Sequence, residues 1–434
     1  MTAKSGNPTF PFFWRNFLVH AVEGGLYMGG LAFVAVETIL PPLANLLGAP
    51  IWLVSLMPVM LMLGFCTPPL LTAHHVERLV FLKPIIVITG GLQRLPYLFA
   101  GLILFYYNPE RQTLALATVA LTPFISGVVG GLASTAWQSL VANTVPKNRR
   151  ASLFAVRFVI TSFFGVCAGM AITGILAQYP GPRGYGILHL IAFGFLAVSF
   201  FVFVWVREWA PQPPAHPHPQ TLRQNLGCVV DILSKDRCFS RFLLAQGLMK
   251  GIYIMAPFLA IHILETLGKP DSFLGLLVAS QMAGGVAGNF ASGFIGDRWG
   301  GKILMCFARL VFVILALLTM IVGTDGLALL IFFLFGVSFY LDRVGTMTMG
   351  IEMCPERKRP TYLSMLAAIN IPFMLCASFT GTVTLKLTGA FAITSVISIV
   401  AVATSLLILI PIPEPRSIDN QKGKARGFAK GSPA

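Results

Sequence analysis

The chain has 434 residues, of which 56% are hydrophobic and only 11% are charged. A soluble globular protein carries about a quarter charged residues, which coat its surface, so this composition excludes a soluble protein. The composition also excludes a disordered, collagen-like, coiled-coil or disulfide-built chain. The formal net charge of +15 is better explained by membrane topology than by nucleic-acid binding. We therefore expect a polytopic membrane protein.

Twelve apolar stretches are long enough to cross a bilayer, which takes about 20 residues of helix. They are continuous and do not alternate between polar and apolar residues, so we expect helices rather than the strands of a barrel. The predicted spans are residues 12–40, 51–73, 84–107, 113–143, 152–177, 187–206, 241–265, 273–294, 303–323, 326–352, 362–387 and 389–411.

The 31 Lys and Arg residues are distributed unequally between the two sides of this arrangement. Most lie in the N-terminal segment, in alternate loops and in the tail. The loops of the opposite side contain Arg111, Arg183, Lys269 and Lys386. Because basic residues stay on the cytoplasmic side of a membrane, we expect a protein of the plasma (inner) membrane with both termini in the cytoplasm.

The longest loop, about residues 207–240, divides the spans into two sets of six. It opens with a proline-rich spacer, after which Leu222, Leu226 and Leu233 recur at helical spacing among polar residues. This spacing predicts an amphipathic helix on the membrane surface. The expected domains are an N-terminal six-helix bundle over residues 1–206, a cytoplasmic linker over 207–240, a C-terminal six-helix bundle over 241–411 and a basic cytoplasmic tail over 412–434.

The two halves of the chain carry similar residues at corresponding places. Pro146 and Arg150 follow the fourth predicted span as Pro355 and Arg359 follow the tenth, at one constant sequence offset. The glycines at positions 127 and 336, in the preceding spans, share that offset. This order predicts a duplicated unit, and hence an all-α membrane protein of 12 transmembrane helices in two pseudo-symmetric six-helix bundles.

The turn between the eighth and ninth spans reads Gly293-Phe-Ile-Gly-Asp297-Arg298-Trp-Gly300-Gly301-Lys302. It resembles the cytoplasmic signature of the major facilitator superfamily, from which Gly301 departs because a basic residue is usual there. The first half keeps Glu77 and Arg78 at the corresponding place but lacks the glycines. The resemblance implies the fold of that superfamily and a conformational role for Gly293, Asp297, Arg298, Gly300, Lys302, Glu77 and Arg78. We expect Gly293 and Gly300 to allow close helix approach and a sharp reversal of the chain.

Ionisable residues at membrane depth are costly, so each one indicates a functional site. At about 1.5 Å per helical residue, several of them lie near the midplane. These residues are Glu23, Arg94, Lys250, Asp342 and Arg343. Arg157 and Arg309 lie nearer the cytoplasmic helix ends, where their long side chains can extend toward the cytoplasm, and fixed ion pairs are the favoured interpretation for these two residues.

In the superfamily that the chain resembles, the first, fourth, seventh and tenth helices line the central cavity. The resemblance therefore implies a substrate and ion pathway formed by the midplane residues, with Tyr27, Gln138 and Tyr253 as polar lining. We expect Glu23 to be the proton-coupling site, and Lys250 and Arg343 to receive an anionic group. The alternative is a set of fixed ion pairs that orient the helices, such as Glu23 with Lys250 and Asp342 with Arg94.

These features favour a secondary active transporter that moves a small organic, anionic or zwitterionic solute by alternating access with proton coupling. Two alternatives remain open: an exporter of lipophilic compounds or lysolipids, and a non-transporting membrane scaffold or sensor on the same fold. The seven cysteines occur singly and no catalytic motif is recognisable, so we expect no enzyme activity, no catalytic residue, no cofactor and no metal. The expected partners are the solute, protons and the lipid bilayer, without nucleic acid, for a monomeric protein.

Overall fold

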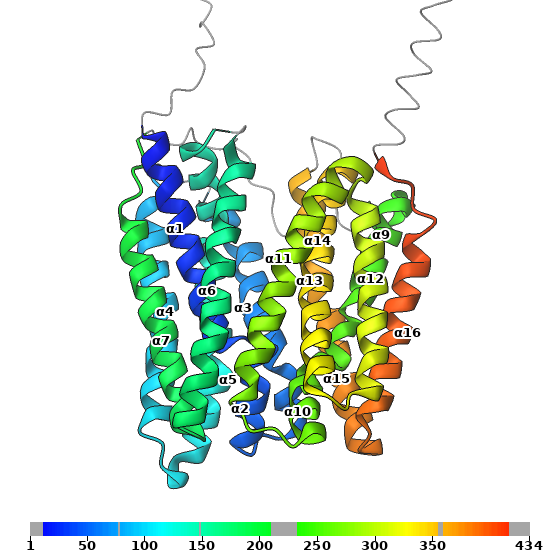
Figure 1. Cartoon of the computed structure of the whole chain (residues 1–434). Coiled ribbons are helices and arrows are strands. Elements are labelled where there is room, and N and C mark those ends of the chain that lie inside the picture. Colours follow the sequence, from blue (N-terminus) through cyan, green and yellow to red (C-terminus); the bar gives the residue numbers. More distant parts are fainter. Residues whose placement is uncertain (1–11, 77–78, 147–148, 210–231, 355–358, 416–434) are drawn as a thin grey trace, which may run out of the picture. The chain divides into compact units, whose positions relative to one another are not determined.

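The structure is a computed structural model that describes residues 12–76, 79–146, 149–209, 232–354 and 359–415 (Figure 1). Every regular element in these ranges is a helix, which confirms the all-α prediction. Most of the predicted linker helix, the tail after residue 415, and Glu77 and Arg78 lie outside the described residues.

The chain forms two compact units. The first contains Met1–Gly48 and Met60–Pro219, and the second contains Ala49–Val59 and Gln220–Ala434. The helix that begins at residue 51 therefore contributes its first turns to the second unit, where the hydroxyls of Ser55 and Thr382 are hydrogen-bonded at 2.7 Å.

The helices of the first part of the chain follow one another through short turns. Their bounds are α1 Phe13–Leu31, the 3₁₀ turn η1 Ala32–Val34, α2 Leu40–Leu46, α3 Ile51–Val76, α4 Lys83–Phe105, the 3₁₀ turn η2 Pro109–Arg111, α5 Gln112–Thr144, α6 Arg150–Gln178 and α7 Pro182–Val204.

The second part of the chain has the same kind of organisation. Its elements are α9 Arg237–Met249, the 3₁₀ segment η4 Lys250–Ile254, α10 Ala256–Leu267, α11 Phe273–Trp299, α12 Gly301–Leu318, the 3₁₀ turn η5 Thr319–Ile321, α13 Asp325–Met353, α14 Arg359–Ala368, α15 Asn370–Thr388 and α16 Phe391–Leu409. Within this unit, α13 packs against both α11 and α12 (Figure 1).

Eleven helical stretches among the described residues are long and apolar enough to cross a membrane. The second predicted span corresponds to α3, whose apolar part Ile51–Cys66 is shorter. The first predicted span, 12–40, is helical only as far as Val34, and α2 follows with Pro41 and Pro42 in its first turn. The seventh predicted span, 241–265, is interrupted before α10, which has Pro257 in its first turn. A proline lacks the N–H that a continuing helix needs, so the helix breaks before it.

Glycines bring helix backbones into contact in both units. A methyl group on Gly336 of α13 would collide with the carbonyl oxygen of Gln281 in α11, and one on Gly127 of α5 would collide with that of Leu61 in α3. In a bilayer, helices associate largely through such close packing of small residues. Gly127 and Gly336, which occupy corresponding places in the two halves of the sequence, therefore have the same packing role in each half.

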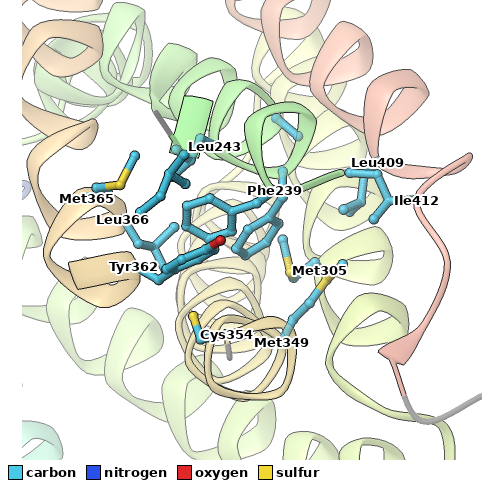
Figure 2. Packing of buried hydrophobic residues seen from close by; sticks show 13 residues of the cluster. Phe239, Leu243, Met305, Met349, Cys354, Tyr362, Met365, Leu366, Leu409 and Ile412 are labelled. Atoms are coloured by element: carbon cyan, nitrogen blue, oxygen red, sulfur yellow. The ribbon is translucent and has the colours of Figure 1, made fainter. Parts of the chain in front are cut away.

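A hydrophobic cluster closes the end of the second unit near residues 232–243 (Figure 2). The rings of Phe239 and Tyr362 face each other with centroids 4.4 Å apart. Asp236 joins this cluster to the start of α9, because its carboxylate accepts hydrogen bonds from the Phe239 N–H at 2.9 Å and the Tyr362 hydroxyl at 3.2 Å. This cap explains why α9 begins at Arg237.

We predict that Gly336→Ala lowers the stability of the protein by about 1–3 kcal/mol, the usual cost of forcing extra volume into a packed interior. Thermal unfolding of the purified protein in detergent measures the change. Gly326→Ala is the matched control, because Gly326 lies on the same helix and a methyl group there meets nothing within 4 Å. Equal effects of the two substitutions would contradict the packing role.

Candidate functional site

The first unit holds a buried ion pair between α1 and α6. Oε2 of Glu23 lies 3.8 Å from Nη1 of Arg157, and the two side chains are 9% and 14% exposed. Gly24 makes this approach possible, because a side chain at that position would occupy the place of the Arg157 guanidinium. The guanidinium also lies over the ring of Trp137, 5.0 Å from its centroid.

Arg94 on α4 supplies a second buried cation to this cluster. Its Nε donates to the carbonyl oxygen of Leu196 at 2.6 Å, and Nη2 donates to the Ser199 hydroxyl at 3.2 Å. The guanidinium lies 5.3 Å from the centroid of the Tyr27 ring. Four helices, α1, α4, α6 and α7, thus bring one carboxylate and two guanidinium groups together.

The ionised form of Glu23 is incompletely satisfied. Among the described residues, Oε2 is buried and has no hydrogen-bond partner. The ion pair with Arg157 is longer than a hydrogen bond. His20 lies one turn earlier, where its Nε2 is 3.1 Å from the hydroxyl oxygen of Thr144. Protonation of the Glu23 carboxylate would therefore break few contacts.

The second unit holds a tighter cluster around Asp342 on α13. Nη1 of Arg309 on α12 donates to Oδ1 of Asp342 at 3.1 Å, and the Arg309 side chain is fully buried. The other guanidinium nitrogens are also bound: Nε donates to the Ser405 hydroxyl at 2.8 Å, and Nη2 donates to Oε1 of Gln246 at 2.9 Å. The Gln246 amide group in turn donates to the Thr346 hydroxyl. This arrangement fixes Arg309 from several helices.

Lys250 is the second cation beside Asp342. Its Nζ lies 3.9 Å from Oδ2 of Asp342, and its side chain is 21% exposed, against 0% for Arg309. Lys250 is the first residue of the 3₁₀ segment η4, which follows directly after the α-helical hydrogen bonding of α9 ends. A short 3₁₀ stretch inside a span often marks a functional hinge.

The ion pairs differ from the alternatives that the sequence suggested. Asp342 pairs with Arg309 and Lys250, and Glu23 pairs with Arg157. Arg157 and Arg309 are the arginines of these pairs, which fits the interpretation of the two residues as members of fixed ion pairs. The depth of Arg157 and Arg309 along their helices did not indicate which carboxylates they pair with. The rule that any ionisable residue inside a span deserves a functional interpretation would have included both.

The remaining predicted pathway residues lie in several environments. Tyr27 accepts a hydrogen bond from the Gln93 amide at 2.7 Å. Tyr253 is buried in η4. Arg343 on α13 and Gln138 on α5 are exposed. Thus Glu23, Arg94 and Tyr27 lie together in the first unit and Lys250 lies with Asp342 in the second, whereas Arg343 turns away from its neighbour Asp342.

The signature segment forms the turn between α11 and α12. Gly300 has φ of +88°, a backbone conformation that favours glycine, and the Glu414 carboxylate occupies the space of its missing side chain. Gly293 does not provide the expected close approach, because a methyl group on this exposed glycine would meet nothing within 4 Å. Together with Arg298 it lines a groove along α11. For Asp297 the structure describes only the backbone, within α11.

A carboxylate caps one helix start in each unit. Glu414 accepts a hydrogen bond from the Lys302 N–H at 3.1 Å, and Lys302 Nζ donates to the carbonyl oxygen of Ile410 at 2.7 Å. In the first unit, Glu208 accepts from the N–H groups of Leu82 at 3.0 Å and Lys83 at 2.9 Å. Lys83 Nζ donates to a carbonyl oxygen of α7 at 2.7 Å. The degenerate first copy of the signature therefore keeps the same helix cap.

Glu37 is a further acidic residue that the sequence analysis missed. It lies in the turn between η1 and α2, after the span Phe13–Val34, and is half-buried. Burial raises the pKa of its carboxyl from 4.5 to about 7. The signal was present in the sequence, because Glu37 is an acid within a long apolar stretch.

The apolar helices and the charge clusters within them are typical of a polytopic membrane protein with a functional site inside its spans. Residues 242–433 match the family model described as Major Facilitator Superfamily. A search of curated protein sequences finds no match.

Solved structures of transporters share the fold at low sequence identity. A D-xylose–proton symporter is 15% identical with a TM-score of 0.70, covering 93% of this chain and 99% of that one. The nucleoside transporter NupG is 12% identical with a TM-score of 0.67, covering 91% and 98%. The fucose–proton symporter FucP of E. coli is 14% identical with a TM-score of 0.61, covering 92% and 98%.

The second part of the chain is thus similar to the major facilitator superfamily, and the chain shares its fold with solved structures of transporters.

We predict that Glu208→Ala lowers the stability by about 1 kcal/mol, because two backbone N–H groups at the start of α4 lose their acceptor. Thermal unfolding in detergent tests this change. Glu265→Ala removes an exposed carboxylate near the end of α10 and serves as control. A Glu208 variant as stable as this control would contradict the capping role.

Glu37 predicts a pH dependence of stability. Because the pKa of its carboxyl is higher in the fold than its ordinary value of 4.5, ionising it costs stability. The stability that the protonated Glu37 carboxyl contributes is fully present below about pH 4.5 and is lost as the pH rises through about 7. Thermal unfolding of the wild type and Glu37→Gln should therefore differ in pH slope over this window, with a smaller loss in the variant. Parallel curves would contradict the assignment.

Proposed function

We propose that the protein is a proton-coupled secondary transporter of a small anionic or zwitterionic organic solute. The observation that carries the proposal is the composition of the two charge clusters. Glu23 is accompanied by Arg157 and Arg94, and Asp342 by Arg309 and Lys250. Among the described residues, each cluster places two cations beside one carboxylate inside apolar spans.

The excess of cations supports an anionic group on the solute. Charge that is not compensated in an apolar interior costs free energy. A solute carboxylate or phosphate would offset this cost, and guanidinium and ammonium groups are the side chains that bind such anions. A neutral solute would leave the imbalance in place.

Glu23 is the proposed proton carrier. Its Oε2 has no hydrogen-bond partner among the described residues and its ion pair is long, so a proton would replace few contacts. Asp342 is less suited to this role, because Arg309 donates directly to it at 3.1 Å. Proton and solute would then be exchanged as the two bundles expose their sites alternately to each side of the membrane. We place the protein in the plasma (inner) membrane as a monomer with cytoplasmic termini.

The decisive experiment is counterflow of radiolabelled solutes in proteoliposomes, with and without a pH gradient. A transporter exchanges solute in both conditions, and a proton-coupled one accumulates it when a gradient is imposed. A scaffold or sensor would exchange no solute and would tolerate Glu23→Gln and Lys250→Met together. This result would overturn the proposal.

We predict that Glu23→Gln abolishes uptake driven by the pH gradient while part of the exchange activity persists, because an amide fills the same volume but cannot release a proton. Glu265→Gln is the matched control and should behave as wild type. Equal loss of driven uptake and exchange in Glu23→Gln would instead assign Glu23 to solute binding or to structure.

A further inference from the structure

His20 on α1 makes a hydrogen bond that fixes which of its ring nitrogens carries the hydrogen. The hydroxyl of Thr144, the last residue of α5, donates its single hydrogen to the carbonyl oxygen of Leu140 at 2.7 Å. The hydroxyl oxygen can therefore only accept from His20, whose Nε2 lies 3.1 Å away. In the neutral ring Nε2 consequently carries the hydrogen, and the second nitrogen, Nδ1, is an acceptor.

This acceptor nitrogen is buried without a partner. Nδ1 of His20 has no hydrogen-bond partner among the described residues, and the whole residue is buried. The ring of Phe203 from α7 lies nearby, with the two ring centroids 6.2 Å apart, and offers no donor. Buried polar atoms in folded proteins are nearly always hydrogen-bonded, so the orphaned Nδ1 indicates a group that binds it in another state of the protein.

Glu23 supplies the missing donor when its carboxyl is protonated. Residues 20 and 23 lie one turn apart on the same side of α1, where Cβ atoms are about 5–6 Å from each other. Long side chains on a helix lean toward its N-terminus, so that of Glu23 leans toward His20. In the part of the chain that the structure describes, Oε2 of Glu23 is also buried without a hydrogen-bond partner. A proton on this oxygen would turn two orphaned acceptors into a donor and an acceptor.

The neighbouring charges determine how the two residues share a proton. Arg157 of α6 interacts electrostatically with both His20 and Glu23, and Arg94 of α4 interacts with Glu23. The contacts of α5 and α7 with the imidazole ring are uncharged. A buried imidazolium beside guanidinium groups is costly, so it needs the Glu23 carboxylate ionised next to it. The pair therefore holds one proton that passes between its members and is not stored on the histidine.

We propose that His20 relays the proton between Glu23 and the end of the first unit where α1 begins and α5 ends, to which it lies one turn nearer. This inference rests on the proposed role of Glu23 as the proton carrier and identifies its partner. The proton leaves Oε2 of Glu23 for Nδ1 of His20, and the electron pair stays on the carboxylate. The imidazolium then gives one proton to water at that end of the unit. The neutral ring returns to the Nε2–H form, because only this form donates to Thr144.

The resting state of the ring is tested by nitrogen NMR. The purified full chain in detergent, labelled with ¹⁵N-histidine, should show a neutral ring with its hydrogen on Nε2 in the signal that His20→Gln removes. Thr144→Val keeps the shape of the side chain but removes the acceptor, so the ring should then populate the Nδ1–H form. A wild-type ring with its hydrogen on Nδ1, or a charged ring at neutral pH, would overturn the relay, because Nδ1 could then accept no proton.

The contact between the two residues is tested by infrared spectroscopy of the same protein over a pH titration. The carbonyl stretch of the protonated Glu23 carboxyl is the band that Glu23→Gln removes. In His20→Phe, which keeps a ring without nitrogen, this band should move to higher wavenumber because the carboxyl loses its acceptor. His189→Phe is the matched control, because His189 on α7 is also buried and also has an unpartnered ring nitrogen among the described residues. An unmoved band in His20→Phe would overturn the inference.

The relay itself is tested by its rate. After a pH jump in a stopped-flow infrared cell, the Glu23 band should appear and disappear about a hundredfold more slowly in His20→Gln, a loss within the range that a positioned acid or base contributes. Glutamine can still donate to Thr144, whereas it cannot take up a proton. His189→Gln should behave as wild type. Equal rates in His20→Gln and the wild type would make His20 a structural residue and overturn the proposal.

These measurements separate the relay from the proposed function, because none of them uses a solute. A pH-dependent band that Glu23→Gln removes, but whose position and rate are the same in the His20 variants, would retain Glu23 as the proton carrier and overturn the relay. The absence of any such band would overturn both. Thr144→Val leaves both members of the pair in place, so its NMR signal remains informative where a His20 variant unfolds.

Discussion

A carboxylate buried among apolar helices needs a cation beside it, and this requirement organises both halves of the protein. Glu23 and Asp342 each lie against an arginine that comes from a neighbouring helix of the same unit. The cost of leaving either charge uncompensated is several kilocalories per mole in order of magnitude. The helices that carry these residues must therefore pack so that the ion pairs form, and the small residues between them allow that packing.

Both clusters pair a carboxylate with an arginine, but the two ion pairs differ in how closely their atoms approach. In the second unit, Arg309 donates hydrogen bonds to Ser405, Gln246 and Asp342, so the carboxylate of Asp342 is held firmly. In the first unit, Glu23 is held loosely by Arg157. A tight pair suits a fixed charge, whereas a loose one suits a group that changes its protonation state.

Much of the fold could be predicted from the sequence. The length and polarity of the apolar stretches predict the helices, and the signature at residues 293–302 indicates the superfamily. The break before α10 was missed, although Pro257 indicates it, and the helix α2 was missed because Pro41 and Pro42 indicated a loop. The members of the site could be found as charges inside spans, but their pairing could not. Position along a helix gives the depth of a residue, whereas pairing depends on helix rotation and on which helices are neighbours, as for Arg309 and Asp342.

Gly24 shows how a residue without functional groups can belong to a charge cluster. Its missing side chain is the space in which the Arg157 guanidinium lies beside Glu23. Mutational scanning for loss of activity would consequently single out this glycine together with the acid that precedes it. Homologues with a larger residue at this position would have to neutralise the acid from another direction, so the identity of residue 24 marks which relatives share the same electrostatic design.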